Sequence, residues 1–239
     1  ATYGGGIANH GGTVTVTQSL LQANNAQKGG AIFNGSGMLT VNSSTLDSNT
    51  SGEGAGLFVS VGSAAITGST ISNNQAAIVG GGLLNGRGTV AVINSTFSGN
   101  EAGQGGGGAM HVSSGTVTMN SSTVATNRAR HGGGVYVWTG AVTINNSILS
   151  QNGSGDCWGQ TNDIFSGRNN LDSDGTCPGT QRLVGLDTQL ADHGGPTWTH
   201  ALMSNSNAID SGDPNFCPST DQRGSSRVGL CDIGAFEAD

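Results

Sequence analysis

The chain has 239 residues, of which 43 are glycine, whereas only 10% are charged. Its 15 acidic side chains outnumber its 8 basic ones, and the formal net charge is -7. This balance argues against nucleic acid as a partner, because nucleic-acid binding needs a basic footprint. No apolar run reaches the roughly 18 residues that a membrane span requires. Length and composition therefore favour an elongated domain with neither a nucleic-acid partner nor a membrane span.

From its first residues the chain repeats itself about every 25 residues. Six copies begin with a glycine-rich tetrapeptide, at Gly4, Gly29, Gly54, Gly80, Gly107 and Gly132. Two apolar columns follow in each copy, two residues apart, which is the period of a β-strand. The pattern predicts an all-β, right-handed parallel β-helix, a solenoid with six regular coils and about three short strands per coil. Its inward side chains should stack into one apolar core.

Two polar positions are unchanged in all six copies. One is the serine column, and the other is the asparagine column: Ser19, Ser44, Ser69, Ser95, Ser122 and Ser147; Asn24, Asn49, Asn74, Asn100, Asn127 and Asn152. Stacked asparagine amides can hydrogen-bond along the axis and satisfy turn backbone, so we interpret both columns as structural rather than as a ligand ladder. The glycines predict corners that need a positive φ or a close approach between coils.

Two sets of motifs resemble known bacterial β-helix proteins. The repeat Gly-Gly-Gly-Ile-x-Asn … Val-x-Val-x-x-Ser-Thr-Leu-x-x-Asn, over residues 4–154, resembles that of the polymorphic outer-membrane protein type. The motifs at residues 190–197, 208–213, 220–224 and 231–237 are similar to the end of the "choice-of-anchor" β-helix proteins. The resemblance implies an exported bacterial protein, located at the cell surface or outside the cell. It implies no particular activity.

The C-terminal part, residues 155–239, is less regular than residues 1–154 and contains all four cysteines. We expect it to form irregular coils and a cap that continue the same domain. Pairing of sequence neighbours gives the disulfides Cys157–Cys177 and Cys217–Cys231, whereas a zinc site made by all four thiolates is the alternative. Disulfides indicate an oxidising, exported setting.

Groups that could perform catalysis are sparse in the regular coils. Polysaccharide lyases and hydrolases with this architecture need clustered carboxylates, or a calcium-binding acid cluster with a base, but Asp47, Glu53 and Glu101 lie in different coils. The best local candidate for a glycan site combines cationic and aromatic side chains: Arg128, Arg130, His131, Tyr136 and Trp138. Its alternative interpretation is a solvated turn with an aromatic side chain stacked on its neighbour.

Five aspartates in the irregular region could supply oxygen ligands to calcium: Asp156, Asp163, Asp172, Asp174 and Asp187. The segment Asp172-Ser173-Asp174-Gly175 has the alternating acids of a calcium loop, although the twelfth-position glutamate of an EF-hand is missing. We therefore take Asp172 and Asp174 as candidate calcium ligands and expect no other cofactor.

The outward positions predict interaction surfaces. A largely apolar stripe contains Phe33, Phe58, Leu84 and Tyr136, and we expect the tail of the chain or another chain to cover it. Two threonine stripes run along the coils, and flat threonine arrays can bind ice: Thr15, Thr40, Thr118 and Thr143; Thr45, Thr70, Thr96 and Thr123. Exposed β surfaces favour threonine in any case. The first coil has no covering helix, and its open strand edges predict either self-association or a further N-terminal segment that covers them.

The sequence thus favours a non-catalytic structural or adhesive module, extracellular or on the cell surface, that associates with itself or with other surface proteins. The first alternative is a carbohydrate-active enzyme or glycan-binding protein with a pectate-lyase-like fold. The second is ice binding through the threonine stripes.

Overall fold

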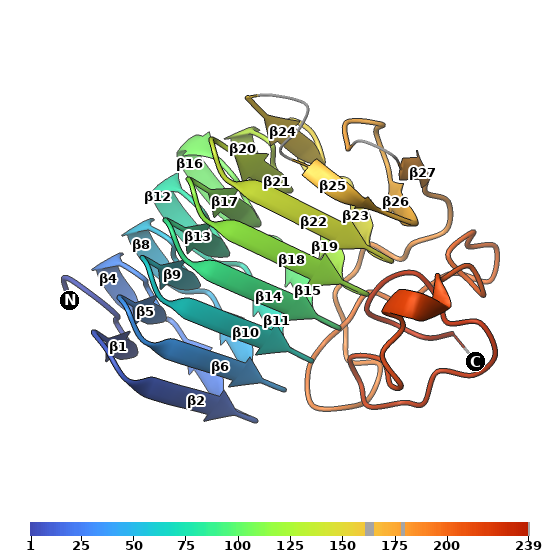
Figure 1. The fold of residues 1–239 in the computed structure, drawn as a ribbon, viewed down its shortest axis with the longest axis horizontal. Helices are drawn as coiled ribbons and strands as arrows, with labels where there is room; N and C mark the ends of the chain where they lie inside the picture. Colours follow the sequence, from blue (N-terminus) through green and yellow to red (C-terminus); the bar gives the residue numbers. More distant parts are fainter. Residues whose placement is uncertain (161–164, 178–179, 239) are drawn as a thin grey trace.

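The structure is a computed structural model that describes residues 1–160, 165–177 and 180–238, so Asp163 lies outside the described residues. It confirms the parallel β-helix, with about six turns of about 25 residues each. Each of the first five coils contains four short strands rather than the expected three, whereas the sixth contains three, and equivalent strands of successive coils pair in parallel (Figure 1).

The strands form four sheets. The first sheet consists of β1 (Ile7–Asn9), β5 (Ile32–Asn34), β9 (Leu57–Val59), β13 (Leu83–Asn85), β17 (Met110–Val112), β21 (Val135–Val137) and β24 (Cys157–Gly159). The second sheet has the longest strands in most coils: β2 (Thr13–Thr17), β6 (Met38–Asn42), β10 (Ser63–Thr67), β14 (Thr89–Ile93), β18 (Thr116–Asn120), β22 (Ala141–Asn145) and β25 (Phe165–Arg168).

The third and fourth sheets complete each coil. The third contains β3 (Leu20–Gln22), β7 (Thr45–Asp47), β11 (Thr70–Ser72), β15 (Thr96–Ser98), β19 (Thr123–Ala125), β23 (Ile148–Ser150), β26 (Asn170–Asp172) and β27 (Thr180–Arg182). The fourth contains β4 (Asn25–Lys28), β8 (Thr50–Glu53), β12 (Gln75–Val79), β16 (Glu101–Gly106) and β20 (Arg128–His131).

The apolar columns read from the repeat fill the interior of the solenoid. Their members pair in register from coil to coil, as in Val14↔Leu39 and Val16↔Val41. One buried cluster runs from Val16 to Cys157 and Cys177. Since each strand is only three to six residues long, a single coil buries little, and the stacked coils stabilise one another.

The corners between strands explain why the coil has four strands. The residue just before each serine of the serine column has a positive φ in every regular coil, and in five of the six it is not glycine: Gln18, Ser43, Asn94, Ser121 and Asn146, with Gly68 as the exception. The residue before each asparagine of the asparagine column behaves in the same way. These left-handed residues break the chain at points that carry no glycine signal in most copies. At the predicted corners Gly4, Gly29, Gly54, Gly80, Gly107 and Gly132, positive φ values are confirmed.

The serine and asparagine columns are structural ladders, as predicted. The amide Nδ2 of each of the first five asparagines donates to Oδ1 of the next, over 2.8–3.0 Å. From the second coil onward, Nδ2 also donates to a backbone carbonyl of the preceding coil, for example Asn100 Nδ2 to Ile71 O at 2.8 Å. From the second coil onward, each serine hydroxyl accepts from the backbone N–H of the preceding serine in the column, as Ser69 Oγ does from Ser44 at 3.1 Å. The ladders therefore satisfy buried polar groups that would otherwise be costly.

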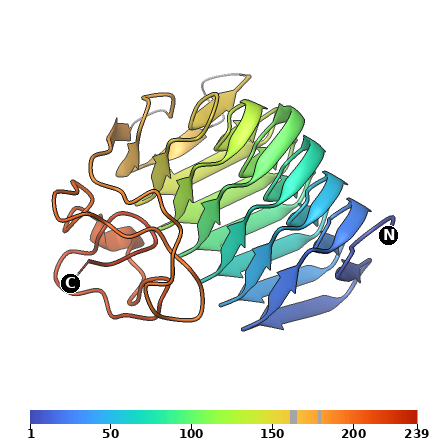
Figure 2. The same ribbon diagram turned by 180° about the vertical axis from the view of Figure 1, so that it is seen from behind.

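After β27 the chain turns back as the tail (residues 183–238), which lies beside the solenoid rather than over its end (Figures 1 and 2). Its described residues contain one short 3-10 helix, η2 (Pro214–Phe216). Backbone and side-chain contacts attach it to the third sheet and the adjoining corner: Thr96 Oγ1 to Gln222 Oε1, Ala235 N to Thr123 Oγ1, and Asn146 Nδ2 to Asp213 O.

Covalent and ionic links hold this irregular region together. Both disulfides that were predicted from sequence neighbours form, Cys157–Cys177 and Cys217–Cys231. A buried ion pair joins Arg223 to Asp221 at 2.8 Å, and a second joins Arg227 to Glu237 at 2.8 Å. These contacts replace the regular coil-to-coil pairing that the tail lacks.

Candidate functional site

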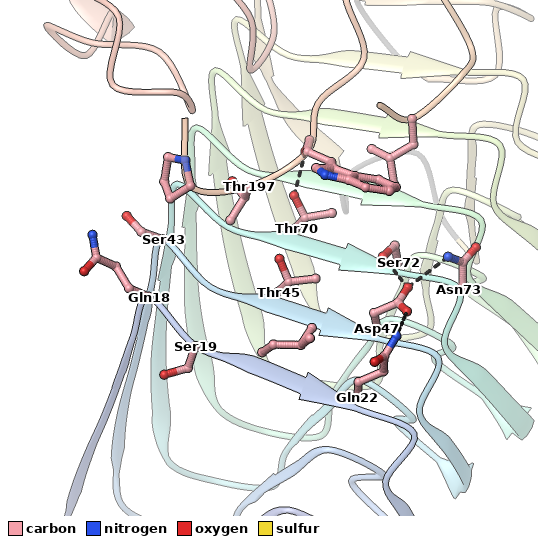
Figure 3. Close-up of a pocket in the computed structure, with 14 residues that line it drawn as sticks. Gln18, Ser19, Gln22, Ser43, Thr45, Asp47, Thr70, Ser72, Asn73 and Thr197 are labelled. Carbon is pink, nitrogen blue, oxygen red and sulfur yellow. Dashed lines mark hydrogen bonds between the residues drawn. The ribbon is translucent and has the colours of Figure 1, made fainter. Parts of the chain in front are cut away.

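The tail leaves part of the third sheet open, and the tail cleft, of about 570 Å³, lies there. Its floor is formed by β3, β7 and β11 with the corners beside them, and its wall by the segment 190–198 of the tail. Figure 3 shows Gln18 and Ser43 at one end of the cleft and Gln22, Asp47, Ser72 and Asn73 gathered at the other. Thr45 and Thr70 lie between these ends.

Strand alternation determines which side chains reach the floor. On each of these strands the central residue, such as Leu21 or Leu46, points into the core, and the residues on either side point outward. In later coils the equivalent outward positions are covered by the tail, and Thr96 and Thr123 are 0% and 1% exposed. In the first coil Leu20 is 62% exposed. The cleft is thus the stretch of this sheet that the tail does not reach.

Trp198 contributes the aromatic part of the wall. Its backbone carbonyl accepts from Thr70 Oγ1 at 2.6 Å and from Gln222 Nε2 at 3.0 Å. The neighbouring Thr197 hydroxyl donates to Gly68 O at 2.9 Å. The Trp198 residue is nevertheless 54% exposed. The backbone is therefore fixed to the sheet while the indole remains open to a ligand.

Asp47 organises the opposite end of the cleft. Its Oδ1 accepts from Ser72 Oγ at 2.8 Å and Asn73 Nδ2 at 2.9 Å, and its Oδ2 accepts from Gln22 Nε2 at 3.0 Å and Ser48 Oγ at 2.8 Å. Partial burial on its own raises the pKa of Asp47, but the four hydrogen bonds together outweigh it and hold the pKa below its ordinary value. The carboxylate is ionised at neutral pH and its oxygens are occupied by groups of the chain itself.

The composition of the cleft limits its chemistry. Asp47 is the one carboxylate among the lining residues that the structure describes, and none of these is lysine, arginine or histidine. Glycosidic cleavage by paired carboxylates needs a second acid about 5–10 Å away, and this cleft does not supply one. What it does present is an indole, several hydroxyls and three side-chain amides, a set suited to binding.

The cationic and aromatic group predicted as a glycan site is only partly brought together. His131 lies 5.7 Å from Trp158, which stacks on Tyr136 with ring centroids 4.6 Å apart, and Trp138 lies 6.5 Å from Tyr136. Trp158, which was not predicted, connects His131 to Tyr136, and Tyr136 is the centre of this stack. Tyr136 itself is buried, at 6% exposure, and Trp138 is 51% exposed. Arg128 and Arg130 are exposed at the outer face of the fourth sheet.

The predicted calcium ligands do meet. Asp172 and Asp174 have carboxylate oxygens within 4.8 Å of each other and of Asp156, so these three residues could hold a cation. However, Asp156 already accepts from Asn152 and Ser173, and Asp174 from Thr176 and from the Asp156 backbone. Burial raises the pKa of Asp156 more than these hydrogen bonds lower it. In the structure Asp156 ends the asparagine ladder, a role that accounts for the burial of its carboxylate.

The apolar stripe expected to form an exposed interface is buried within the chain itself. Phe33, Phe58, Leu84 and Tyr136 are 4–8% exposed, so the expectation that they face a partner or lie under the tail is wrong. Glycine corners fold across them: a Cβ at Gly106 would lie within 2.2 Å of the Tyr136 ring. Lys28 and Val79 complete the cover over Phe58 and Leu84. The glycines permit this approach because they have no side chain.

The two threonine stripes differ in their exposure to solvent. The stripe on the second sheet, which includes Thr15 and Thr118, is open to solvent. In the stripe on the third sheet Thr70, Thr96 and Thr123 are at most 1% exposed, because their hydroxyls bond to the tail. The threonine stripe on the third sheet is therefore not a free surface beyond Thr45.

No protein-family model, curated protein or solved structure matches this chain. Within the described residues, none of the segments forms an apolar helix of membrane-spanning length.

The sequence did not reveal the tail cleft as a site. Asp47 had been noted only as an isolated acid, and Trp198 lies 128 residues from the Thr70 that anchors it. One signal was available: in the outward column Gln22, Asp47, Ser72, Ser98, Ala125, Ser150, the single charge is Asp47. A lone charge in a neutral column indicates a local polar network.

Proposed function

We propose that this chain is a non-catalytic adhesive module that acts outside the cell or at its surface, and that the tail cleft is its adhesive site. The observation that carries the proposal is the state of Asp47. The only acid of the described cleft lining accepts four hydrogen bonds from neighbouring side chains and is held ionised. Such a carboxylate positions other groups, and it neither donates a proton nor attacks a substrate.

The rest of the molecule supports a stable, rigid display of this site. Continuous ladders, a buried core along the solenoid, a second buried cluster shared with the tail and two disulfides fix the coils and the tail. The disulfides fit an oxidising environment, as an exported protein would meet. The partners of such a module are molecules of surrounding surfaces, including other surface proteins, glycans and further copies of the chain.

The experiment is a paired measurement of adhesion and turnover. Beads coated with the chain are applied to immobilised polysaccharides and to bacterial cell surfaces, and the same polysaccharides are assayed for new reducing ends and unsaturated products. We expect retention of the beads without products. Sustained release of products at enzymatic rates would contradict the proposal and would favour the carbohydrate-active alternative.

A further inference from the structure

We propose that the tail cleft binds a neutral glycan chain, with one pyranose ring stacked on Trp198 and its hydroxyls bonded to the amides beside Asp47. The inference deepens the proposed function, on which it rests, by naming the class of ligand. It concerns residues outside the cationic and aromatic group around Tyr136.

The Trp198 indole can accept a sugar ring on its face, and its backbone is fixed to the sheet. The Trp198 residue is 54% exposed, whereas Thr197, next to it, is 3% exposed and Gln222, which bonds to both, is 2% exposed. The C–H bonds on one side of a pyranose form an apolar, weakly positive face, which complements the negative face of an indole. A backbone held before binding lowers the entropy lost when the ligand is bound.

The polar groups opposite the platform are oriented before any ligand arrives. Gln22 and Asn73 each give one amide N–H to Asp47, at 3.0 and 2.9 Å. Each amide therefore keeps a second N–H and its carbonyl oxygen, and these can bond to sugar hydroxyls, which both donate and accept. Asp47 is a positioning residue in this arrangement, because it sets the rotation of both amides.

Charge selects a neutral ligand. The ionised Asp47 repels the carboxylates of acidic glycans, and no basic side chain lines the described cleft to offset that repulsion. An amino sugar gains little, since both Asp47 oxygens already accept two hydrogen bonds each. A neutral glycan fits the indole, the amides and the hydroxyls of the floor without an unpaired charge.

The test uses the full chain and titration calorimetry with defined oligosaccharides: cellohexaose, xylohexaose and mannohexaose as neutral probes, and hexagalacturonate as the acidic one. We expect at least one neutral probe to bind, with an affinity that is insensitive to salt. Trp198→Ala should weaken that binding at least ten-fold. Trp138→Ala is the matched control, since Trp138 is 51% exposed on another part of the solenoid, and it should leave the affinity unchanged.

Asp47→Asn separates positioning from folding. Its amide would place an N–H against the donors of Gln22 or Asn73, so we expect weaker neutral-glycan binding with unchanged melting temperature to within a few degrees. The side-chain amide resonances of Gln22 and Asn73 should shift in the free protein. Unchanged amide resonances together with wild-type affinity would remove Asp47 from this role.

The outcomes distinguish the two proposals. Binding of hexagalacturonate alone, or loss of binding in Trp138→Ala but not in Trp198→Ala, would overturn the assignment of the cleft. Adhesion of coated beads without binding of any neutral probe would overturn it too, while leaving the adhesive function standing. Binding of a neutral probe followed by its cleavage would keep the cleft and overturn the non-catalytic function.

Discussion

At the scale of single residues, the asparagine ladder shows how a polar column can be buried without loss. Asn100 is fully buried, and its side chain accepts from the backbone and amide of Asn74 while it donates to Ile71 O and Asn127 Oδ1. Every hydrogen-bonding group of the amide is used. Removal of one asparagine leaves hydrogen-bonding groups in both neighbouring coils without a partner. Each unsatisfied buried group costs about 1–3 kcal/mol.

Asn100→Ala should therefore lower the free energy of unfolding by about 3–5 kcal/mol, measured by urea unfolding. Asn24→Ala is the control. Asn24 lies in the first coil and donates to Asn49, but among the described contacts nothing donates to its side chain. Its loss should cost only about 1 kcal/mol. Equal costs at the two positions would show that the ladder is not what stabilises the coils.

His200 is a buried titratable group between the tail and the third sheet. Its Nδ1 lies 3.0 Å from Asp187 O and donates to it, because a carbonyl can only accept, and its Nε2 lies 2.9 Å from Ser98 Oγ and accepts from it in the neutral ring. Burial lowers the pKa of His200 to about 4; Asp187, by its carbonyl and its charge, raises it, and the charge of His193 lowers it. Charging this ring opposes folding.

Stability should therefore decrease in acid. The unfolded chain takes up a proton near pH 6.5 and the folded chain only near pH 4, so the contribution of His200 is complete above pH 6.5 and is lost as the pH falls toward 4. The full loss amounts to about 3 kcal/mol. Melting temperatures between pH 7 and pH 4 measure it, and His200→Gln, which stays neutral, should flatten the slope in this window. An unchanged slope in the variant would assign the acid sensitivity elsewhere.

At the scale of the strand and its corner, the glycine at the start of each repeat combines two constraints. Gly80 has φ +66°, and a Cβ there would lie 2.7 Å from Leu83 O and 2.9 Å from Leu84 Cβ. Gly175 has a similar φ of +80° with nothing within 4 Å. Comparison of Gly80 with Gly175 therefore separates the cost of a positive φ from the cost of losing the close approach that covers the apolar stripe.

Gly80→Ala should lower the free energy of unfolding by about 3 kcal/mol or more, and Gly175→Ala by only about 1–2 kcal/mol, the cost of a left-handed backbone for alanine. Chemical unfolding of both variants measures the difference. Similar values would mean that the corner relaxes and that the glycine is required for its φ alone.

The repeat predicted much at this scale, and the reasons are physical. The inward apolar columns, the polar ladders and the corners such as Gly80 all recur at the period of the repeat. Because successive coils stack in register, residues one repeat apart in the sequence contact each other. The fourth strand was missed because the corner residues before it, such as Ala23 and Ser48, adopt a positive φ without being glycine. The burial of Phe33 and Phe58 was missed because alternation predicts which face a residue takes and not what folds over that face.

At the scale of the whole molecule, the solenoid has two unlike ends. β1, β2 and β3 each have a neighbouring strand on one side only. At the other end of the asparagine ladder, Asp156 accepts from Asn152 at 2.7 Å and, as a carboxylate, has no N–H to pass on. Asp156 is fully buried and its other oxygen accepts from Ser173, so the ladder is closed at this end and offers no free N–H to the first coil of another chain.

Self-association of the chain as it stands should accordingly stop at pairs joined through their first coils. Sedimentation velocity over a range of concentrations should show masses of one or two 23.7 kDa chains. Filaments in electron micrographs would contradict this expectation and would require a different contact between the ends.

The path of the tail is the part of the fold that the sequence predicted least. Its motifs predicted a distinct C-terminal region and its disulfide pairs, but its path across the third sheet depends on contacts such as Thr96 with Gln222, 126 residues apart. No period relates these residues. The cleft exists only because the tail crosses the sheet at Thr70 and leaves the first two coils uncovered, and this could not be read from either segment alone.

The most direct measurement is hydrogen–deuterium exchange of the full chain with and without the neutral hexasaccharide that binds it best. The account predicts slower exchange in residues 18–22, 43–47, 70–73 and 196–198, and no change around Arg128 to Trp138. Protection of residues 128–138 with none on the third sheet would contradict it and would return the glycan site to the cationic and aromatic group.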